Sequence, residues 1–190
     1  MAGKRVRGRV NRQMVVETAI GIFNSQGYDR TSMNDIASAL GITKAGLYHY
    51  FASKEEIFVA GLEAASTLIG NTLGDLDTVD LTALERVENF IRSYGNALAD
   101  PIFRCLILAD YRILGPAAQE AIRNCKRRHQ RQCERLLQGM GLNAADARSF
   151  SLTIFGTFNW SAFAFGDNIG RELESQSRML IRLVRSLITG

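Results

Sequence analysis

The stretch from Met33 to Phe51 constrains the fold more than any other part of the chain. Its apolar residues fall at spacings of 4, 2, 5 and 3, which suit two short helices crossing steeply rather than one continuous amphipathic helix. Those apolar residues are Ile36, Leu40, Ile42, Leu47 and Tyr50. Ala37 stands at the predicted crossing, Gly41 at a turn that requires a left-handed residue, and Thr43 at the N-cap of the second helix.

The second of these helices is predicted to turn a short run of small and hydrogen-bonding residues outward. That run is Lys44, Ala45, Gly46, Tyr48 and His49. Small side chains let a helix approach closely, and the polar ones that follow can donate and accept hydrogen bonds. This combination is typical of a helix that docks into the major groove of DNA.

Positive charge is concentrated around this motif. The whole chain has a net charge of +4. Residues 1–54 carry eight Lys and Arg against three acidic residues, whereas residues 55–190 carry fifteen against sixteen. The excess is partly in a basic arm, Lys4 to Arg9, which we expect to be disordered without its partner. A polyanion is therefore the predicted partner of this end of the chain.

Helical periodicity recurs along most of the length, so the predicted fold class is all-α. A first helix carries Val15, Ala19, Ile22 and Phe23 on one face and ends at Gly27. Ser32 and Asp35 have the spacing of a capping box at the start of the next helix, and Ser53 can cap a long one. Further helices are expected at about 54–73, 81–99, 102–113, 116–138, 144–165 and 170–188, with a polar break at 74–80.

The last two predicted helices are rich in apolar and aromatic side chains. We expect this helical hairpin to bury its surface against a second copy of the chain, as a four-helix dimer interface. The alternative is the core of an ordinary monomer. Trp160 fits either a dimer contact or the core, and a ligand contact is the third alternative.

Several features indicate a reduced cytoplasmic protein. No apolar stretch reaches the roughly 18 residues that span a bilayer, and the charged start has no apolar signal segment. The three cysteines, Cys105, Cys125 and Cys133, form no CxxC pair. Buried inert thiols are the expected state of these residues, with a thiol sensor as the alternative.

Enzyme chemistry finds little support in the sequence. No metal-ligand spacing, phosphate-binding loop or nucleophile motif occurs, and no cofactor is expected. Asp75, Asp77 and Asp80 lack the glycine and glutamate of a calcium loop. The basic run from Arg123 to Arg131 wraps around several helix faces, which favours a solvated surface. A grip on an anionic ligand, such as the phosphates of a coenzyme A thioester, and a second DNA contact are its alternatives.

The motifs in the first 55 residues resemble those of TetR-type transcriptional regulators. The matching residues are Ala19-Ile-x-Ile-Phe23, Gly27-Tyr28, Thr31-Ser32-Met33, Asp35-Ile-Ala37, Gly41-Ile-Thr43, Gly46-Leu-Tyr48, Tyr50-Phe51 and Ser53-Lys-Glu55. The resemblance implies a flexible arm at 1–10, a DNA-binding domain at 11–54 and a helical ligand-binding and dimerisation domain at 55–190. Beyond Leu62 it fades to length and helix layout.

Such a regulator is expected to be a homodimeric repressor that leaves a palindromic operator when a small molecule binds. Carried over by position, the residues that contact DNA would be Thr31, Ser32, Thr43, Lys44, Ala45, Gly46, Tyr48, His49 and Lys54. Thr31, Ser32 and Lys54 would meet phosphates. The alternative is a small-molecule-binding or thiol-redox-sensing protein whose helix-turn-helix does not act at a promoter.

The segment from Phe158 to Gly170 is similar to a subset of these regulators, which includes some that respond to acyl-CoA or lipid-related metabolites. We therefore predict a pocket with apolar walls and a few polar groups between the middle helices. Its candidate lining residues are Phe103, Leu106, Ile107, Asp110, Phe155, Asn159 and Trp160.

Overall fold

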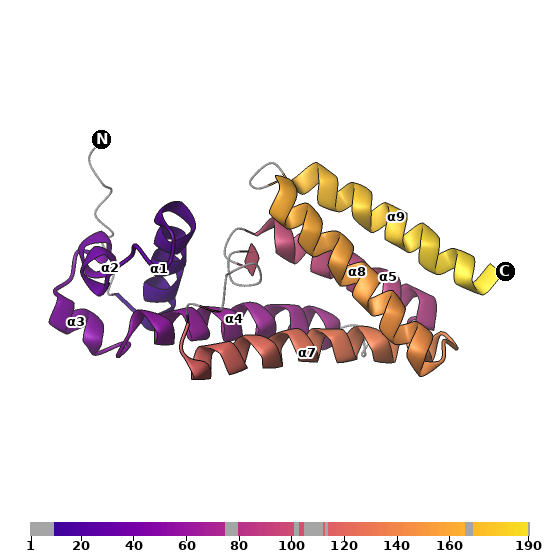
Figure 1. Cartoon of the computed structure of the whole chain (residues 1–190), viewed down its shortest axis with the longest axis horizontal. Coiled ribbons are helices and arrows are strands. Elements are labelled where there is room, and N and C mark those ends of the chain that lie inside the picture. Colours follow the sequence, from indigo (N-terminus) through magenta and orange to yellow (C-terminus); the bar gives the residue numbers. More distant parts are fainter. Residues whose placement is uncertain are drawn as a thin grey trace.

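The described residues of the computed structural model are 10–74, 80–100, 103–104, 112, 114–165 and 169–189, and they form eight helices and no strand. The all-α prediction is therefore confirmed. The predicted helix at 102–113 and the basic arm at 1–9 fall almost entirely outside these residues. Figure 1 shows three short helices at one end of the molecule and longer ones extending away from them.

The three short helices are α1 (Arg12–Gln26), α2 (Met33–Leu40) and α3 (Lys44–Tyr48), and we call residues 11–53 the head. The head has its own apolar interior, to which α1 contributes Val15, Ala19, Ile20 and Phe23. Helix α2 begins with the predicted capping box, in which Ser32 Oγ accepts from the Asp35 N–H and Asp35 accepts from the Ser32 N–H.

Helix α4 (Lys54–Gly74) connects the head to the remaining helices. Its first turn is capped by Ser53 Oγ, which accepts from the Glu56 N–H at 3.1 Å, as predicted. Near its start α4 packs against α1, and along its length it packs against α7 (Pro116–Gly139), as Figure 1 shows. Close packing against α1 depends on Gly61, because a Cβ there would lie 3.2 Å from both Val16 and Ile20.

The remaining helices are α5 (Ala83–Ala99), α8 (Ala144–Phe165) and α9 (Gly170–Thr189), and with α4 and α7 they make up what we call the body. Helix α5 starts two residues later than predicted, because Thr82 and Glu85 form a second capping box. Helix α9 packs on α5 and α8, away from the head (Figure 1). Glu88, 4% exposed, receives hydrogen bonds from Arg92 and Arg185 and so ties α5 to α9.

Candidate nucleic-acid interface

The turn between α2 and α3 has the geometry that the sequence predicts. Gly41 has φ 67° and ψ 28°, in the left-handed region, and its N–H donates back to Ser38. Thr43 Oγ1 then accepts from the Gly46 N–H at 3.0 Å and caps α3. Leu47 is fully buried and holds α3 against the head. A single inward residue leaves the rest of this short helix facing outward.

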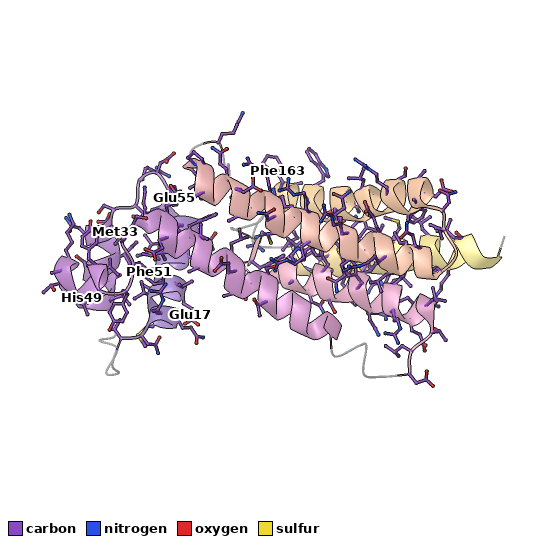
Figure 2. All side chains as sticks on the ribbon, turned by 90° about the horizontal axis from the view of Figure 1, so that it is seen from below. Glu17, Met33, His49, Phe51, Glu55 and Phe163 are labelled. Atoms are coloured by element: carbon purple, nitrogen blue, oxygen red, sulfur yellow. The ribbon has the colours of Figure 1, made fainter. Side chains whose placement is uncertain are left out.

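The outward face of α3 carries the residues expected to approach a nucleic acid. Lys44, Ala45 and His49 are exposed, and Tyr48 is 47% exposed. Lys44 Nζ lies 6.0 Å from the centre of the Tyr48 ring, so a cation and an aromatic hydroxyl share one surface. Figure 2 shows His49 at the outer end of the head, far from the body.

The back of α3 is tied to the start of α1. The Arg12 guanidinium lies 3.9 Å above the Phe51 ring and donates a hydrogen bond to the Tyr50 carbonyl. The Tyr50 hydroxyl donates to the Val10 carbonyl at 2.8 Å. These contacts place Val10 and the start of α1 next to the end of α3.

The structure gives Thr31 and Lys54 internal partners. Thr31 is 2% exposed, and its hydroxyl donates to the Gly27 carbonyl at 2.9 Å. Lys54 Nζ donates to the carbonyls of Tyr28 at 2.7 Å, Thr31 at 3.0 Å and Asp29 at 3.3 Å. Both residues therefore hold the loop between α1 and α2. Sequence reasoning missed this role because the partners are backbone atoms, which no motif encodes.

The interior of the body is an aromatic cluster. Its rings belong to Phe90, Tyr94, Phe103, His129, Phe155 and Phe158, and neighbouring centroids in this cluster lie 4.8 to 6.4 Å apart. The Tyr94 hydroxyl donates to Asn159 Oδ1 at 3.2 Å. Burial raises the pKa of Tyr94, so its hydroxyl stays protonated and available as a donor.

The structure brings three of the predicted pocket residues together in or beside this cluster. They are Phe103, Phe155 and Asn159. It does not bring Trp160 there: Trp160 is 68% exposed and stacks loosely on Phe163, with ring centroids 5.8 Å apart. Leu106, Ile107 and Asp110 lie outside the described residues.

Sequence reasoning missed four members of the cluster, which are Phe90, Tyr94, His129 and Phe158. His129 is 3% exposed, and its Nε2 lies 3.4 Å from Ser66 Oγ. Burial, with a smaller contribution from Arg128, lowers the pKa of His129 to about 4. Cys125, His129 and Cys133 are spaced four residues apart and form one buried stripe of α7. This spacing was the sequence signal that could have identified His129 as a buried residue within the basic run.

The two described cysteines are free and buried, as expected of inert thiols. Burial raises the pKa of Cys125 and raises that of Cys133 to about 12, so neither is a thiolate at neutral pH. On the other faces of α7, Arg123 and Arg127 pair with Glu120 at the surface. These contacts favour the solvated interpretation of the basic run.

Two hollows open on the described surface. One, of about 570 Å³, runs between α4 and α7 and includes Ser66, Asn124 and Arg128 in its lining. The other, of about 520 Å³, lies where α1 meets α4 and the end of α5, with walls that include Val16, Gly61 and Phe103. The described part of the chain holds no group of three or more His, Cys, Asp or Glu side chains that could hold a metal ion. None of its helices is long and apolar enough to cross a bilayer.

Comparison with known proteins matches the head to one family. The family model described as bacterial regulatory proteins, tetR family, matches residues 15–60. Over 59 residues the chain is 34% identical to IcaR, the negative transcriptional regulator of the biofilm operon icaADBC in Staphylococcus aureus strain Newman. That match covers 31% of this chain and 32% of IcaR, so the chain matches about a third of the length of this relative.

Solved structures are similar over nearly the whole chain. PfmR, a TetR family regulator from Thermus thermophilus, has a TM-score of 0.75 at 23% identity, covering 92% of this chain and 97% of PfmR. FadR from Bacillus subtilis, in complex with stearoyl-CoA, also has a TM-score of 0.75, at 19% identity and the same coverage of both chains. At these identities the likeness shows a shared fold. The relatives and structures named here are transcriptional regulators rather than enzymes.

Proposed function

Because the chain belongs to the TetR family of bacterial transcriptional regulators, we propose that it is a homodimeric repressor. It binds a two-fold operator through α3 and leaves it when a small molecule binds in the body. The observation that carries the proposal is the outward face of α3, where Lys44, Tyr48 and His49 stand exposed on a buried anchor, Leu47. Repression is the activity named for IcaR, which is 34% identical to this chain over 59 residues.

The residues predicted to contact DNA differ in whether their polar atoms are free or already bonded within the head. Thr43, Lys44, Ala45, Gly46, Tyr48 and His49 lie at or beside the major groove, where Ala45 and Gly46 permit close approach. Thr31 and Lys54 act indirectly, since their polar atoms already hold the α1–α2 loop. Ser32 remains exposed at the start of α2, but its bonds to Asp35 make capping its main role.

The dimer forms through an apolar face of α8 and α9. The exposed apolar residues of these two helices are Leu152, Trp160, Phe163, Phe165, Leu183 and Leu187. Neighbouring apolar side chains left in water favour association with a complementary surface. A second copy supplies that surface by two-fold symmetry, and two heads about one DNA turn apart then read a two-fold site.

The effector is an acyl-CoA or another lipid-related metabolite whose apolar part enters the aromatic cluster. Phe103 and Phe155 supply apolar walls, and Asn159 supplies a polar atom at its edge. The support is the likeness in fold to FadR, which was solved with stearoyl-CoA. The described arginines of the basic run stay at the surface, so we assign them no contact with the acyl chain.

A mobility-shift experiment with the DNA upstream of the gene tests the proposal. Lys44→Ala and Tyr48→Ala should each raise Kd. The loss of binding free energy should be roughly 1–3 kcal/mol for each residue that contacts the DNA directly. Arg131→Ala removes one positive charge from the body and is the control, because α7 lies away from the proposed DNA-binding face. If all three variants bind the DNA as tightly as the wild type does, α3 does not read DNA.

The release step is tested on the same complex. Adding acyl-CoAs of increasing chain length should dissociate the wild-type protein from its DNA at micromolar or lower concentration. By linkage, DNA should weaken the binding of that acyl-CoA by the same factor. Retention of the complex at every chain length would reject the effector class and leave the DNA assignment standing.

A further inference from the structure

The start of α7 lacks a side-chain cap of its own, because its N-cap residue is Gly115 and its first helical residue is Pro116. A residue of α4 takes that place. The Gly115 N–H donates to Glu55 Oε2 at 3.1 Å, across 60 positions of the sequence. Figure 2 shows Glu55 in the first turn of α4, beside the start of α7. Its negative charge suits the positive end of the α7 dipole.

This contact is built for close approach. A Cβ on residue 115 would lie 2.9 Å from Glu55 Oε1 and 3.1 Å from Oε2. Any residue other than glycine would therefore push the carboxylate away from the N–H that it accepts. The contact depends on the side chain at 55 and equally on the missing side chain at 115, so it can be broken from either side.

The neighbouring residue joins the same turn of α4 to the head. Lys54 binds three carbonyls of the α1–α2 loop, and Gly61, two turns further along, lets α4 pack tightly on α1. The head therefore moves with the first turns of α4. Glu55 is the point on those turns that holds the start of α7.

We propose that Glu55 is a positioning residue that couples the body to the head through its hydrogen bond with Gly115. This inference rests on the proposed function, in which a ligand in the body alters DNA binding. A shift of Gly115 withdraws the N–H from Glu55 and releases the first turn of α4. Because coupling between two sites is reciprocal, binding of DNA to the head must alter the freedom of the α7 start.

Hydrogen exchange of the full-length protein tests this with DNA as the only added ligand. In the wild type, the upstream DNA fragment should change the exchange rate of the amides at 115–122 by about fivefold or more. Glu55→Ala and Gly115→Ala should both abolish that DNA-dependent change. Glu55→Gln should retain most of it, since its amide oxygen can still accept from Gly115. Glu63→Ala, which removes an exposed glutamate from the same helix, should leave the change intact.

A second measurement covers the case in which one variant folds poorly. If the two residues act through one contact, the Kd of Glu55→Ala/Gly115→Ala should match that of a single variant rather than the product of both effects. A DNA-dependent change that persists in Glu55→Ala, or is absent from a DNA-bound wild type, overturns the coupling. A wild type that fails to bind DNA contradicts instead the proposed function.

Discussion

At the scale of single residues, the body contains a titratable group that the proposed DNA binding does not use. His129 lies among Tyr94, Phe103 and Ser66, where a charged imidazolium would be poorly solvated. The positive charge of Arg128 also disfavours protonation of the His129 ring and so lowers its pKa further. Near pH 6.5, where the unfolded chain begins to protonate His129, the residue therefore stays neutral in the folded protein.

This residue gives the protein a pH-dependent stability. The folded pKa of about 4 lies below the ordinary 6.5, so the stabilisation is present above pH 6.5 and is lost as the pH falls toward 4. The loss attributable to His129 should be on the order of 2 kcal/mol by about pH 5. Denaturant unfolding of the wild type and of His129→Leu across this pH range measures the effect. The carboxylates are common to the two proteins, so the difference between their profiles belongs to His129. Parallel pH profiles for the two proteins would contradict the assignment.

At the scale of elements, the head depends on one backbone geometry. Gly41 at φ 67° has no heavy atom within 4 Å of the position a Cβ would take. Gly41→Ala should therefore destabilise by about 1–2 kcal/mol through backbone strain alone. Gly21→Ala is the matched control, since that site is equally open but helical, and alanine there should stabilise by about 0.5–1 kcal/mol. Urea unfolding at one protein concentration measures both, and similar values for the two variants would contradict the strain.

Some features of the elements can be predicted from neighbouring residues in the sequence, and others depend on contacts between distant residues. The Ser32–Asp35 capping box and the Gly41 turn were predictable, because each depends on residues within about one turn of the chain. The helix at 144–165 was predictable from helical periodicity along one continuous segment. The contacts of Lys54 with Tyr28 and of Glu55 with Gly115 were not, because they join residues 26 and 60 positions apart. The same limit explains why the sequence placed Trp160 among the pocket candidates. Only the packing of α8 reveals which way that residue faces.

At the scale of the whole molecule, the proposed function requires two copies. Leu183 is 43% exposed on α9, at the proposed dimer interface. Leu183→Glu places a charge in that interface and should yield monomers in sedimentation at micromolar concentration, because an unpaired buried charge is strongly unfavourable. Gln138→Glu adds the same charge to an exposed site on α7 and should leave the dimer intact. A wild type that sediments as a monomer would falsify the proposed interface.

The sole tryptophan of the chain, Trp160, is exposed on α8 within the proposed interface. Indole emission is sensitive to the polarity of its surroundings, and under excitation that spares the five tyrosines it comes from a single position in each chain. The protein therefore carries an intrinsic fluorophore for its own assembly, undiluted by signal from the head or from the aromatic cluster. Dissociation of the proposed dimer on dilution can be followed in unlabelled protein while DNA and effector are titrated separately.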